Sequence, residues 1–268
     1  MTDFQISSDL IALAHQLADA AGAVVRRYFR TSFQVDGKAD LSPVTVADRE
    51  AERVMRAIIA ANRPEDGIWG EEFGAERGDA PFLWVLDPVD GTRAFMTGKP
   101  VFGTLIGLLH QGVPVLGVID QPVLRERWIG GAGYPTLFNG APCRTRACAA
   151  LDQAVVTVGH LPFPKVRETD MRVYRALVTA AATEAVGGDC YAYAMLASGH
   201  GDVVIENELK LHDFAALAPV VAGAGGAMTD WRGQPLRMDS AGDVLAVGDE
   251  RVLQAALEVI RSGKGDGL

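Results

Sequence analysis

The chain has 268 residues, of which 49% are hydrophobic, and this length suits one large domain or two halves that share a core. Its formal net charge of −9 at pH 7 argues against nucleic-acid or anionic-membrane binding driven by counterion release. The charge does not exclude a phosphorylated substrate, because bound divalent cations would reverse the local sign.

Two further features concern the cellular setting. The three cysteines form no C-x-x-C pair, which favours reduced thiols in a cytoplasmic protein over a disulfide framework or a zinc site. The N-terminus lacks a basic stretch followed by an apolar one, so no signal peptide is predicted. The longest apolar region, residues 101–119, is interrupted by His110, Gln111, Gly112 and Pro114. It therefore predicts a hairpin and not a membrane span.

The first part of the chain predicts two helices. Apolar residues at helical spacing predict a helix that ends near Phe29. Thr45 and Asp48 have the spacing of a capping box at the start of a second helix, with Asp in place of the usual Glu. Asp48 is therefore expected to cap this helix, although an acid in a first helical turn is also well placed to project towards a metal cluster.

A short strand after the second helix ends at Gly70 and is followed by Glu71 and Glu72. One of these two acids is expected to be a solvated loop charge. The other could join a metal site, provided that its strand lies beside the next one. The Gly-Glu-Glu sequence leaves both interpretations open.

The central feature of the sequence is a buried strand that ends in the turn Asp-Pro-Val-Asp-Gly-Thr, residues 87–92. Asp87 and Asp90 lie on this short turn, and two carboxylates aimed at one point repel each other unless a cation lies between them. Gly91 can adopt backbone shapes that a Cβ would forbid and lets an anion approach the main chain, and Thr92 adds a hydroxyl. Asp-Pro and Asp-Gly are also ordinary turn dipeptides, so this stretch alone leaves a plain turn open.

The strands that follow predict an antiparallel sheet covered by the two helices, an α+β arrangement for residues 1–144. In residues 145–268 strands and helices alternate, which predicts an α/β half. Gly187 and Gly188 open a helix there, and backbone N–H groups at such a start would face an anion. Asp213 begins another helix, either as an N-cap or as a further metal ligand.

Three motifs together resemble those of the inositol monophosphatase family, and the similarity spans nearly the whole chain from Lys38 onward. They are G-E-E at residues 70–72, D-P-V-D-G-T at residues 87–92, and H-D-F-A-A at residues 212–216 followed by A-G-G. Within the family the chain is most similar to the histidinol-phosphate phosphatase branch. This similarity rests on three short motifs, R-A-F at residues 93–95, G-G-D-C-Y at residues 187–191 and H-D-F at residues 212–214.

This resemblance implies a layered α-β-α-β-α sandwich of mixed α+β and α/β type, and hydrolysis of a phosphomonoester with two or three Mg²⁺ ions. It implies a small phosphorylated metabolite as substrate and a homodimer as the assembly. The implied metal ligands are Glu71, Asp87, the backbone carbonyl of Val89, Asp90 and Asp213. The catalytic residues expected in this scheme are Glu71, Thr92, Asp48 and Asp90, and the expected substrate contacts are Gly91, Thr92, Gly188, Asp189, Glu206 and Asp213.

In the same scheme Glu71 and Thr92 position and deprotonate the attacking water, and Asp48 lies near Thr92 and a third metal position. Backbone N–H groups of Gly91 and Thr92 hold phosphate oxygens. One departure is His212, since the family commonly has Trp before the last metal-binding Asp. His212 is expected to be a pocket wall, a substrate contact or a packing residue. It is not expected to be a metal ligand, because hard Mg²⁺ prefers oxygen.

The expected function is a magnesium-dependent phosphatase that converts histidinol phosphate to histidinol. Asp189 and Glu206 could attract a cationic amine or form hydrogen bonds with hydroxyl groups. The first alternative is an inositol monophosphatase, and a sugar bisphosphatase or a 3′-nucleotidase is a weaker one. The alternative outside enzymes is a catalytically silent regulator that binds metal and phosphate. The presence of Thr92 and of every ligand carboxylate argues against that alternative.

Overall fold

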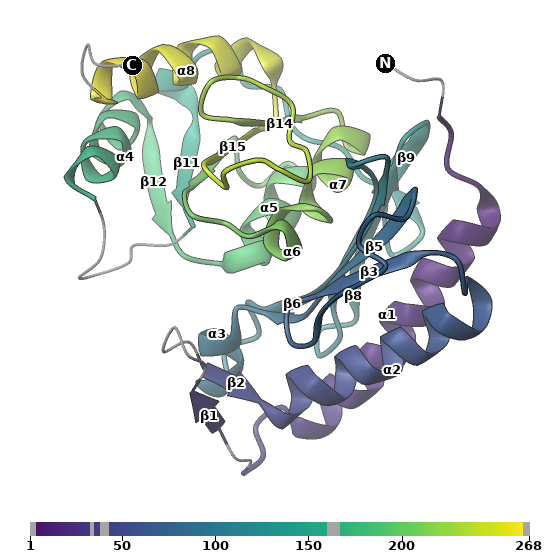
Figure 1. The fold of residues 1–268 in the computed structure, drawn as a ribbon. Coiled ribbons are helices and arrows are strands. Elements are labelled where there is room, and N and C mark those ends of the chain that lie inside the picture. The colour runs from purple at the N-terminus through teal and green to yellow at the C-terminus, as the bar shows by residue number, and fades with distance from the viewer. Residues whose placement is uncertain (1–3, 33–34, 38–42, 160–166, 265–268) are drawn as a thin grey trace.

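Helices and sheets alternate in layers through the part of the chain that the computed structural model describes, residues 4–32, 35–37, 43–159 and 167–264. An eight-stranded sheet and a five-stranded sheet are each packed between two layers of helices, one of which they share (Figure 1). The predicted α-β-α-β-α sandwich is therefore confirmed. The helical layers are, in order, α1 (Ser8–Tyr28) with α2 (Val46–Asn62); α5 (Asp189–Ala197), α6 (Leu211–Phe214) and α7 (Leu217–Gly223); and α4 (Glu168–Ala180) with α8 (Glu250–Lys264).

The first helical layer follows the sequence signals closely. The Ser7 hydroxyl accepts a hydrogen bond from the backbone N–H of Leu10 at the start of α1. At the start of α2, Thr45 and Asp48 form the predicted capping box, in which the Asp48 carboxylate accepts from the Thr45 backbone N–H at 2.9 Å. Such a cap typically stabilises a helix by about 1 kcal/mol. Asp48 is therefore held in place by the helix that it caps.

The large sheet is antiparallel except at one pair of strands. The strands after the central turn pair antiparallel, as predicted. Strand β3 runs parallel to β5, with Gly70 opposite Leu86, a pairing that the sequence did not specify. The reason is that β4 folds back on the outer edge of β3, and the chain then returns to enter β5 in the direction of β3. The strand order is β10 (Ala141–Pro142), β9 (Tyr134–Phe138), β8 (Glu126–Gly131), β7 (Val113–Gln121), β6 (Gly103–His110), β5 (Phe82–Asp90), β3 (Gly67–Gly70) and β4 (Gly74–Glu76).

The small sheet is mixed. Strand β11 pairs in parallel with both β12 and β13, so the carboxyl ends of these three strands lie at one edge of the sheet. Val186 and Glu206 end two of them and lead into the segments that carry Gly188 and Asp213. The strand order is β12 (Thr183–Val186), β11 (Val155–Val158), β13 (Val203–Glu206), β15 (Val244–Val247) and β14 (Ala227–Asp230).

The remaining elements are short. Strands β1 (Val35–Gly37) and β2 (Pro43–Thr45) form a two-stranded sheet beside α3 (Thr92–Met96), and a 3₁₀ turn, η1 (Leu151–Gln153), precedes β11. The helix predicted to begin at Asp213 is divided into two, α6 and α7. Pro219 accounts for the break, because it has no N–H to donate to the carbonyl of Ala215.

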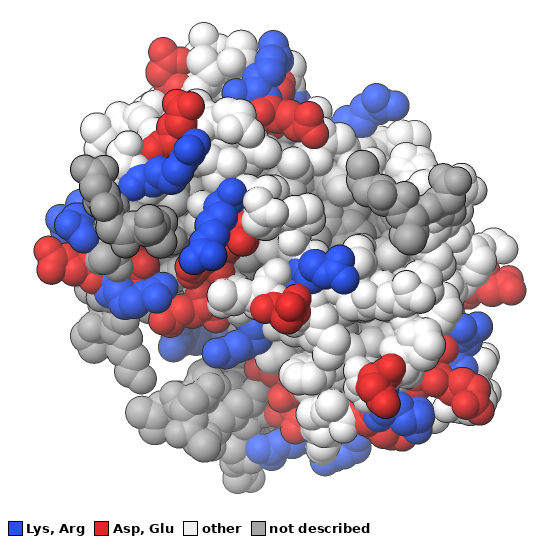
Figure 2. Space-filling view, turned by 45° about the horizontal axis from the view of Figure 1, so that its top comes forward, with Lys and Arg blue, Asp and Glu red and all other residues white. Residues whose placement is uncertain are grey.

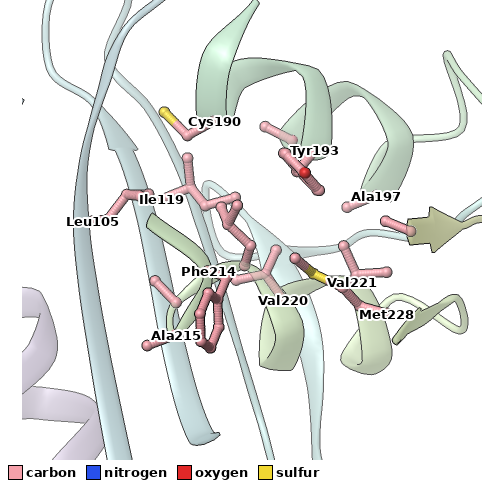
Figure 3. Packing of buried hydrophobic residues seen from close by; sticks show 14 of the residues in the cluster. Leu105, Ile119, Cys190, Tyr193, Ala197, Phe214, Ala215, Val220, Val221 and Met228 are labelled. Atoms are coloured by element: carbon pink, nitrogen blue, oxygen red, sulfur yellow. The ribbon is translucent and has the colours of Figure 1, made fainter. Parts of the chain in front are cut away.

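The middle helical layer packs on the large sheet through a core of buried side chains (Figure 3). Leu105 and Ile119 of the sheet and Phe214 of α6 are each at most 1% exposed, and full burial of such a side chain contributes about 1.5–3 kcal/mol. The backbone also approaches the sheet closely, because a Cβ built on Gly117 would lie 1.8 Å from the carbonyl oxygen of Ala216. The segment between α6 and α7 is thus pressed directly onto β7.

The predicted boundary between residues 1–144 and 145–268 falls between β10 and η1. Because α7 contacts the large sheet and α5 contacts both sheets, the two halves share the middle layer. The division into two halves stays a prediction.

The surface and the helices of the described chain have two further properties. On the face drawn in Figure 2, acidic and basic side chains are interspersed. Of the helices within the described ranges, none combines the length and the apolarity that crossing a bilayer requires.

Candidate active site

Acidic side chains from three separate parts of the chain meet where the two sheets face each other across the middle layer. Asp87, Asp90 and Asp213 form one group, and their nearest ligand-type atoms all lie within 4.8 Å of one another. Glu71, Asp87 and His212 form a second group by the same measure. The structure therefore brings together the four acidic side chains that the sequence singled out as metal ligands.

The central turn is held by its own short hydrogen bonds. The Val89 backbone N–H donates to the Asp87 carboxylate at 3.1 Å, and the Thr92 hydroxyl donates to the Val89 carbonyl, also at 3.1 Å. The register between β5 and β6 shifts between Asp87 and Asp90, which marks an irregularity in the ladder. This shift lets both aspartates leave the strand near one point.

Gly91 is required at the end of this turn for two reasons. Its φ of 83° lies in the left-handed region, which side chains with a Cβ rarely adopt. A Cβ built there would also lie 2.8 Å from an oxygen of the Asp189 carboxylate. The central turn and the first residue of α5 are therefore in close contact across the site.

The start of α5 binds a carboxylate of the protein itself. The backbone N–H of Cys190 donates to the Asp90 carboxylate at 2.6 Å. The sequence predicted an anion at this helix start, and in the described structure that position is taken by Asp90. The helix dipole and the N–H donor both favour the ionised form of Asp90.

Asp189 lies at the same helix start. It has a φ of 44°, a left-handed value that Asp adopts more readily than most residues. Backbone conformations of this kind are held only when the surrounding structure enforces them.

Burial and mutual repulsion dominate the electrostatics of the cluster. Burial raises the pKa of Asp87 well above its ordinary value, and the nearby charges of Glu71, Asp90 and Asp213 raise it further. Burial likewise raises the pKa of Asp90, with Asp189 and Asp213 adding to it. A cation among these oxygens would favour the ionised forms instead. The donor set of Asp87, Asp90 and Asp213 consists of carboxylate oxygens and fits a hard divalent cation such as Mg²⁺.

Asp48 combines the two alternatives left open by the sequence. It caps α2 and is 1% exposed, and it also forms a ligand-type group with Glu71 and Glu72. Burial raises the pKa of Asp48 to about 7; the hydrogen bonds from Thr45 oppose this shift and the charges of Glu72 and Glu71 add to it. Its predicted place beside Thr92 stays a prediction.

Asp213 does not begin its helix, as the sequence had suggested. Helix α6 begins at Leu211 with Lys210 as the preceding residue, and Asp213 is the third helical residue. Its carboxylate reaches back to accept from the Lys210 backbone N–H at 2.6 Å. An acid at this position can satisfy the helix start from inside the first turn, which explains the misplaced boundary.

The small-sheet side of the site holds further acids. Glu206 is the last residue of β13, is 5% exposed, and accepts a hydrogen bond from the Tyr193 hydroxyl at 2.8 Å. Burial raises its pKa to about 8, the Tyr193 hydrogen bond opposes the shift, and Asp189 and Asp213 add to it. Burial also raises the pKa of Asp189, while the charge of Arg93 lowers it. The two acids thus add titratable carboxyl groups beside the predicted metal ligands.

The sequence reasoning missed Glu52, which holds the loop that follows Glu71. Glu52 lies on α2 with no exposed surface, and its carboxylate accepts from the backbone N–H groups of Glu72 at 2.8 Å and Phe73 at 3.2 Å. Arg56 pairs with the same carboxylate at 2.7 Å. A signal was present, because Glu52 lies next to Ala51 among the apolar positions of the helix face, where a solvated charge is not expected.

Known proteins resemble the chain along almost its whole length. The sequence profile of the inositol monophosphatase family matches residues 7–262. The chain is 47% identical over 258 residues to the chloroplastic bifunctional phosphatase IMPL2 of Arabidopsis thaliana, covering 92% of this chain and 73% of that protein. It is 36% identical over 242 residues to a histidinol-phosphatase of Chlorobaculum parvum, with 88% and 91% covered. Its fold matches a solved inositol monophosphatase from Zymomonas mobilis with a TM-score of 0.88 at 47% identity, covering 96% of this chain and 100% of that one.

Proposed function

The chain belongs to the inositol monophosphatase family, whose members are metal-dependent phosphoric monoester hydrolases, and from that premise we propose that it hydrolyses histidinol phosphate to histidinol. The observation that carries this choice of substrate is the pair of acids, Asp189 and Glu206, on the small-sheet side of the cluster. A carboxylate near the leaving group suits an ammonium group on the substrate. Similarity to a histidinol-phosphatase supports the same choice.

We assign the metal ligands to Glu71, Asp87, the Val89 carbonyl, Asp90 and Asp213, and the metal to two or three Mg²⁺ ions. The support for this assignment is the all-oxygen group of Asp87, Asp90 and Asp213, together with Glu71 beside it. When bound, such ions lower the pKa of water and stabilise charge on the transferring phosphoryl group and the leaving oxygen.

The protein's own groups then have separate tasks. Glu71 takes a proton from the attacking water, and the Thr92 hydroxyl orients that water while remaining tied to the Val89 carbonyl. Backbone N–H groups of Gly91, Thr92 and Gly188 bind phosphate oxygens. We assign Asp48, which has a ligand-type atom within 4.8 Å of one on Glu71, to the third metal position.

Inositol monophosphate is the second candidate substrate. It is favoured by the match to the inositol monophosphatase from Zymomonas mobilis, at the same 47% identity as the bifunctional phosphatase. Carboxylates at Asp189 and Glu206 can accept hydrogen bonds from hydroxyl groups as well as from an ammonium group. The two substrates therefore differ in charge and not in the metal chemistry that they need.

A substrate panel tests the proposal. Phosphate release is measured with and without Mg²⁺ on histidinol phosphate, inositol 1-phosphate, fructose 1,6-bisphosphate and 3′,5′-adenosine bisphosphate. We expect the highest kcat/KM on histidinol phosphate. A higher value on inositol 1-phosphate would reverse the choice of substrate, and a lack of Mg²⁺-dependent release from all four would favour the silent regulator. The homodimer and the cytoplasmic location are further proposals, and sedimentation of the purified protein tests the first.

A further inference from the structure

His212 places a nitrogen donor among the acids of the cluster. In the part of the chain that the structure describes, the group of Glu71, Asp87 and His212 has its ligand-type atoms within 4.8 Å of one another. The neighbouring group of Asp87, Asp90 and Asp213 meets the same limit with oxygen atoms alone. The two groups share Asp87 but differ in the chemistry of one donor.

The imidazole of His212 has an unsatisfied nitrogen. Its Nδ1 atom is buried and has no hydrogen-bond partner, while its Nε2 atom lies 3.6 Å from the Asp213 carboxylate, beyond hydrogen-bond range. The side chain is only 15% exposed. A buried polar atom without a partner is costly unless something binds it, and one of the two ring nitrogens lies within 4.8 Å of ligand-type atoms of Glu71 and Asp87.

The nature of the donors selects the cation. Mg²⁺ prefers oxygen ligands, whereas imidazole suits the later first-row transition metals, from Fe²⁺ to Zn²⁺. We propose that Glu71, Asp87 and His212 form a cation position selective for a transition metal, next to the all-oxygen position of Asp87, Asp90 and Asp213. This reverses the expectation from sequence that His212 is not a ligand, and it rests on the proposed function only through the metal roles of Glu71 and Asp87.

Pulsed EPR on protein loaded with one equivalent of Cu²⁺, an EPR-active ion that suits imidazole, tests the proposal directly. The native chain, without an affinity tag and labelled with ¹⁵N-histidine, should show coupling of Cu²⁺ to one imidazole nitrogen. H212Q should lose this coupling. H200Q is the matched control, because His200 is exposed and follows the end of α5 that is opposite to Asp189, and it should keep the coupling. Purely oxygen coordination of Cu²⁺ in the native chain would overturn the proposal, and this measurement does not depend on how well a variant folds.

Calorimetric titration of the metal-free proteins adds a second measurement. H212Q should bind Co²⁺ about 10-fold to 100-fold more weakly than the native chain, the range typical for weakening of a metal site, with Mg²⁺ affinity close to native. Equal losses for Co²⁺ and Mg²⁺ would show that His212 supports the cluster generally and would contradict selectivity.

Phosphate release by the same native preparation separates the two proposals. Mg²⁺-dependent release without nitrogen coupling contradicts only the transition-metal position. Nitrogen coupling without release contradicts only the proposed function.

Discussion

The two sides of the acidic cluster are built in different ways. On the large-sheet side, Glu71 directly follows β3 and Asp87 lies in β5, and these strands are paired with Gly70 opposite Leu86. The Glu71 N–H also donates to the Leu86 carbonyl at 3.1 Å. On the small-sheet side, Asp189 and Asp213 lie in the first turns of helices α5 and α6.

The positions of the acids are therefore fixed in different ways on the two sides. A strand ladder fixes neighbouring residues through a series of hydrogen bonds, so the spacing of Glu71 and Asp87 is set by the sheet. A helix start is set by one or two local bonds and can be altered by few substitutions. We therefore expect changes at the assigned metal ligands to affect every substrate, and changes at Asp189, which lies beyond them, to discriminate among substrates.

The largest effect is expected for D90N. Removal of this charge should lower kcat by about 10³-fold or more on all substrates, at least as much as the loss of one oxyanion-hole donor. The fold should remain, because Asn can still accept the hydrogen bond from the Cys190 N–H. Steady-state kinetics at saturating Mg²⁺ and circular dichroism measure the two effects.

D66N is the matched control for D90N. Asp66 is also a buried carboxylate next to the large sheet, but it precedes β3, at the end opposite to Glu71, and pairs with Arg63 and Trp84. This variant should lose stability and keep its turnover. Near-native hydrolysis by D90N would rule out its role as a metal ligand.

A smaller effect on all substrates is expected for E52Q. The amide has one acceptor oxygen where the carboxylate has two, so one of the N–H groups of Glu72 and Phe73 loses its partner. The concentration of Mg²⁺ needed for half-maximal activity should rise about 10-fold to 100-fold, as for other residues that orient ligands. Titration of activity with Mg²⁺ measures the shift.

E50Q serves as the control for E52Q. Glu50 lies on the same helix and accepts a hydrogen bond from the Tyr28 hydroxyl, away from the loop. Its Mg²⁺ dependence should match the native enzyme. If E52Q also matches it, the loop does not depend on Glu52.

A selective effect is expected on the small-sheet side for D189N. This variant keeps the contact with Gly91 and removes only the charge. Loss of a charge-assisted hydrogen bond costs at least about 1.5 kcal/mol, which corresponds to a roughly tenfold decrease in kcat/KM. The ratio of kcat/KM for histidinol phosphate to that for inositol 1-phosphate should fall by this factor, and equal losses on both would reject the contact with the ammonium group.

The last prediction concerns stability and not turnover, through the pH dependence of unfolding. The pKa of Glu206 rises from 4.5 to about 8 in the folded protein because of burial. The folded state therefore keeps a proton that the unfolded state releases, and the resulting stability is complete below pH 4.5 and is lost as the pH rises through about 8. Within that window the native protein should lose up to about 1.4 kcal/mol per pH unit more than E206Q, which cannot titrate.

Urea unfolding with a chelator present measures this difference between the native protein and E206Q. The chelator is needed because the charges of Asp189 and Asp213 contribute to the shift. Parallel stability profiles of the two proteins would contradict the raised pKa of Glu206.

The features of the fold that depend on local sequence could be predicted, and those that depend on tertiary contacts could not. The capping box of Thr45 and Asp48 and the central turn follow from neighbouring residues, and the structure has them where the sequence indicates. The parallel pairing of β3 with β5 depends on the path of β4, which no local pattern encodes. Similarly, the partner of the α5 start is Asp90, about a hundred positions earlier in the chain.

The close contact of Ala216 with Gly117 has a consequence for folding kinetics. Asp213 reaches Asp87 and Asp90 only when the segment between α6 and α7 lies on β7, so the cluster is complete only after the second half of the chain has docked on the large sheet. Helices and strands can form before that step, but hydrolysis cannot begin. The rate at which activity recovers during refolding should therefore equal the rate of the docking step and not the rate at which secondary structure forms.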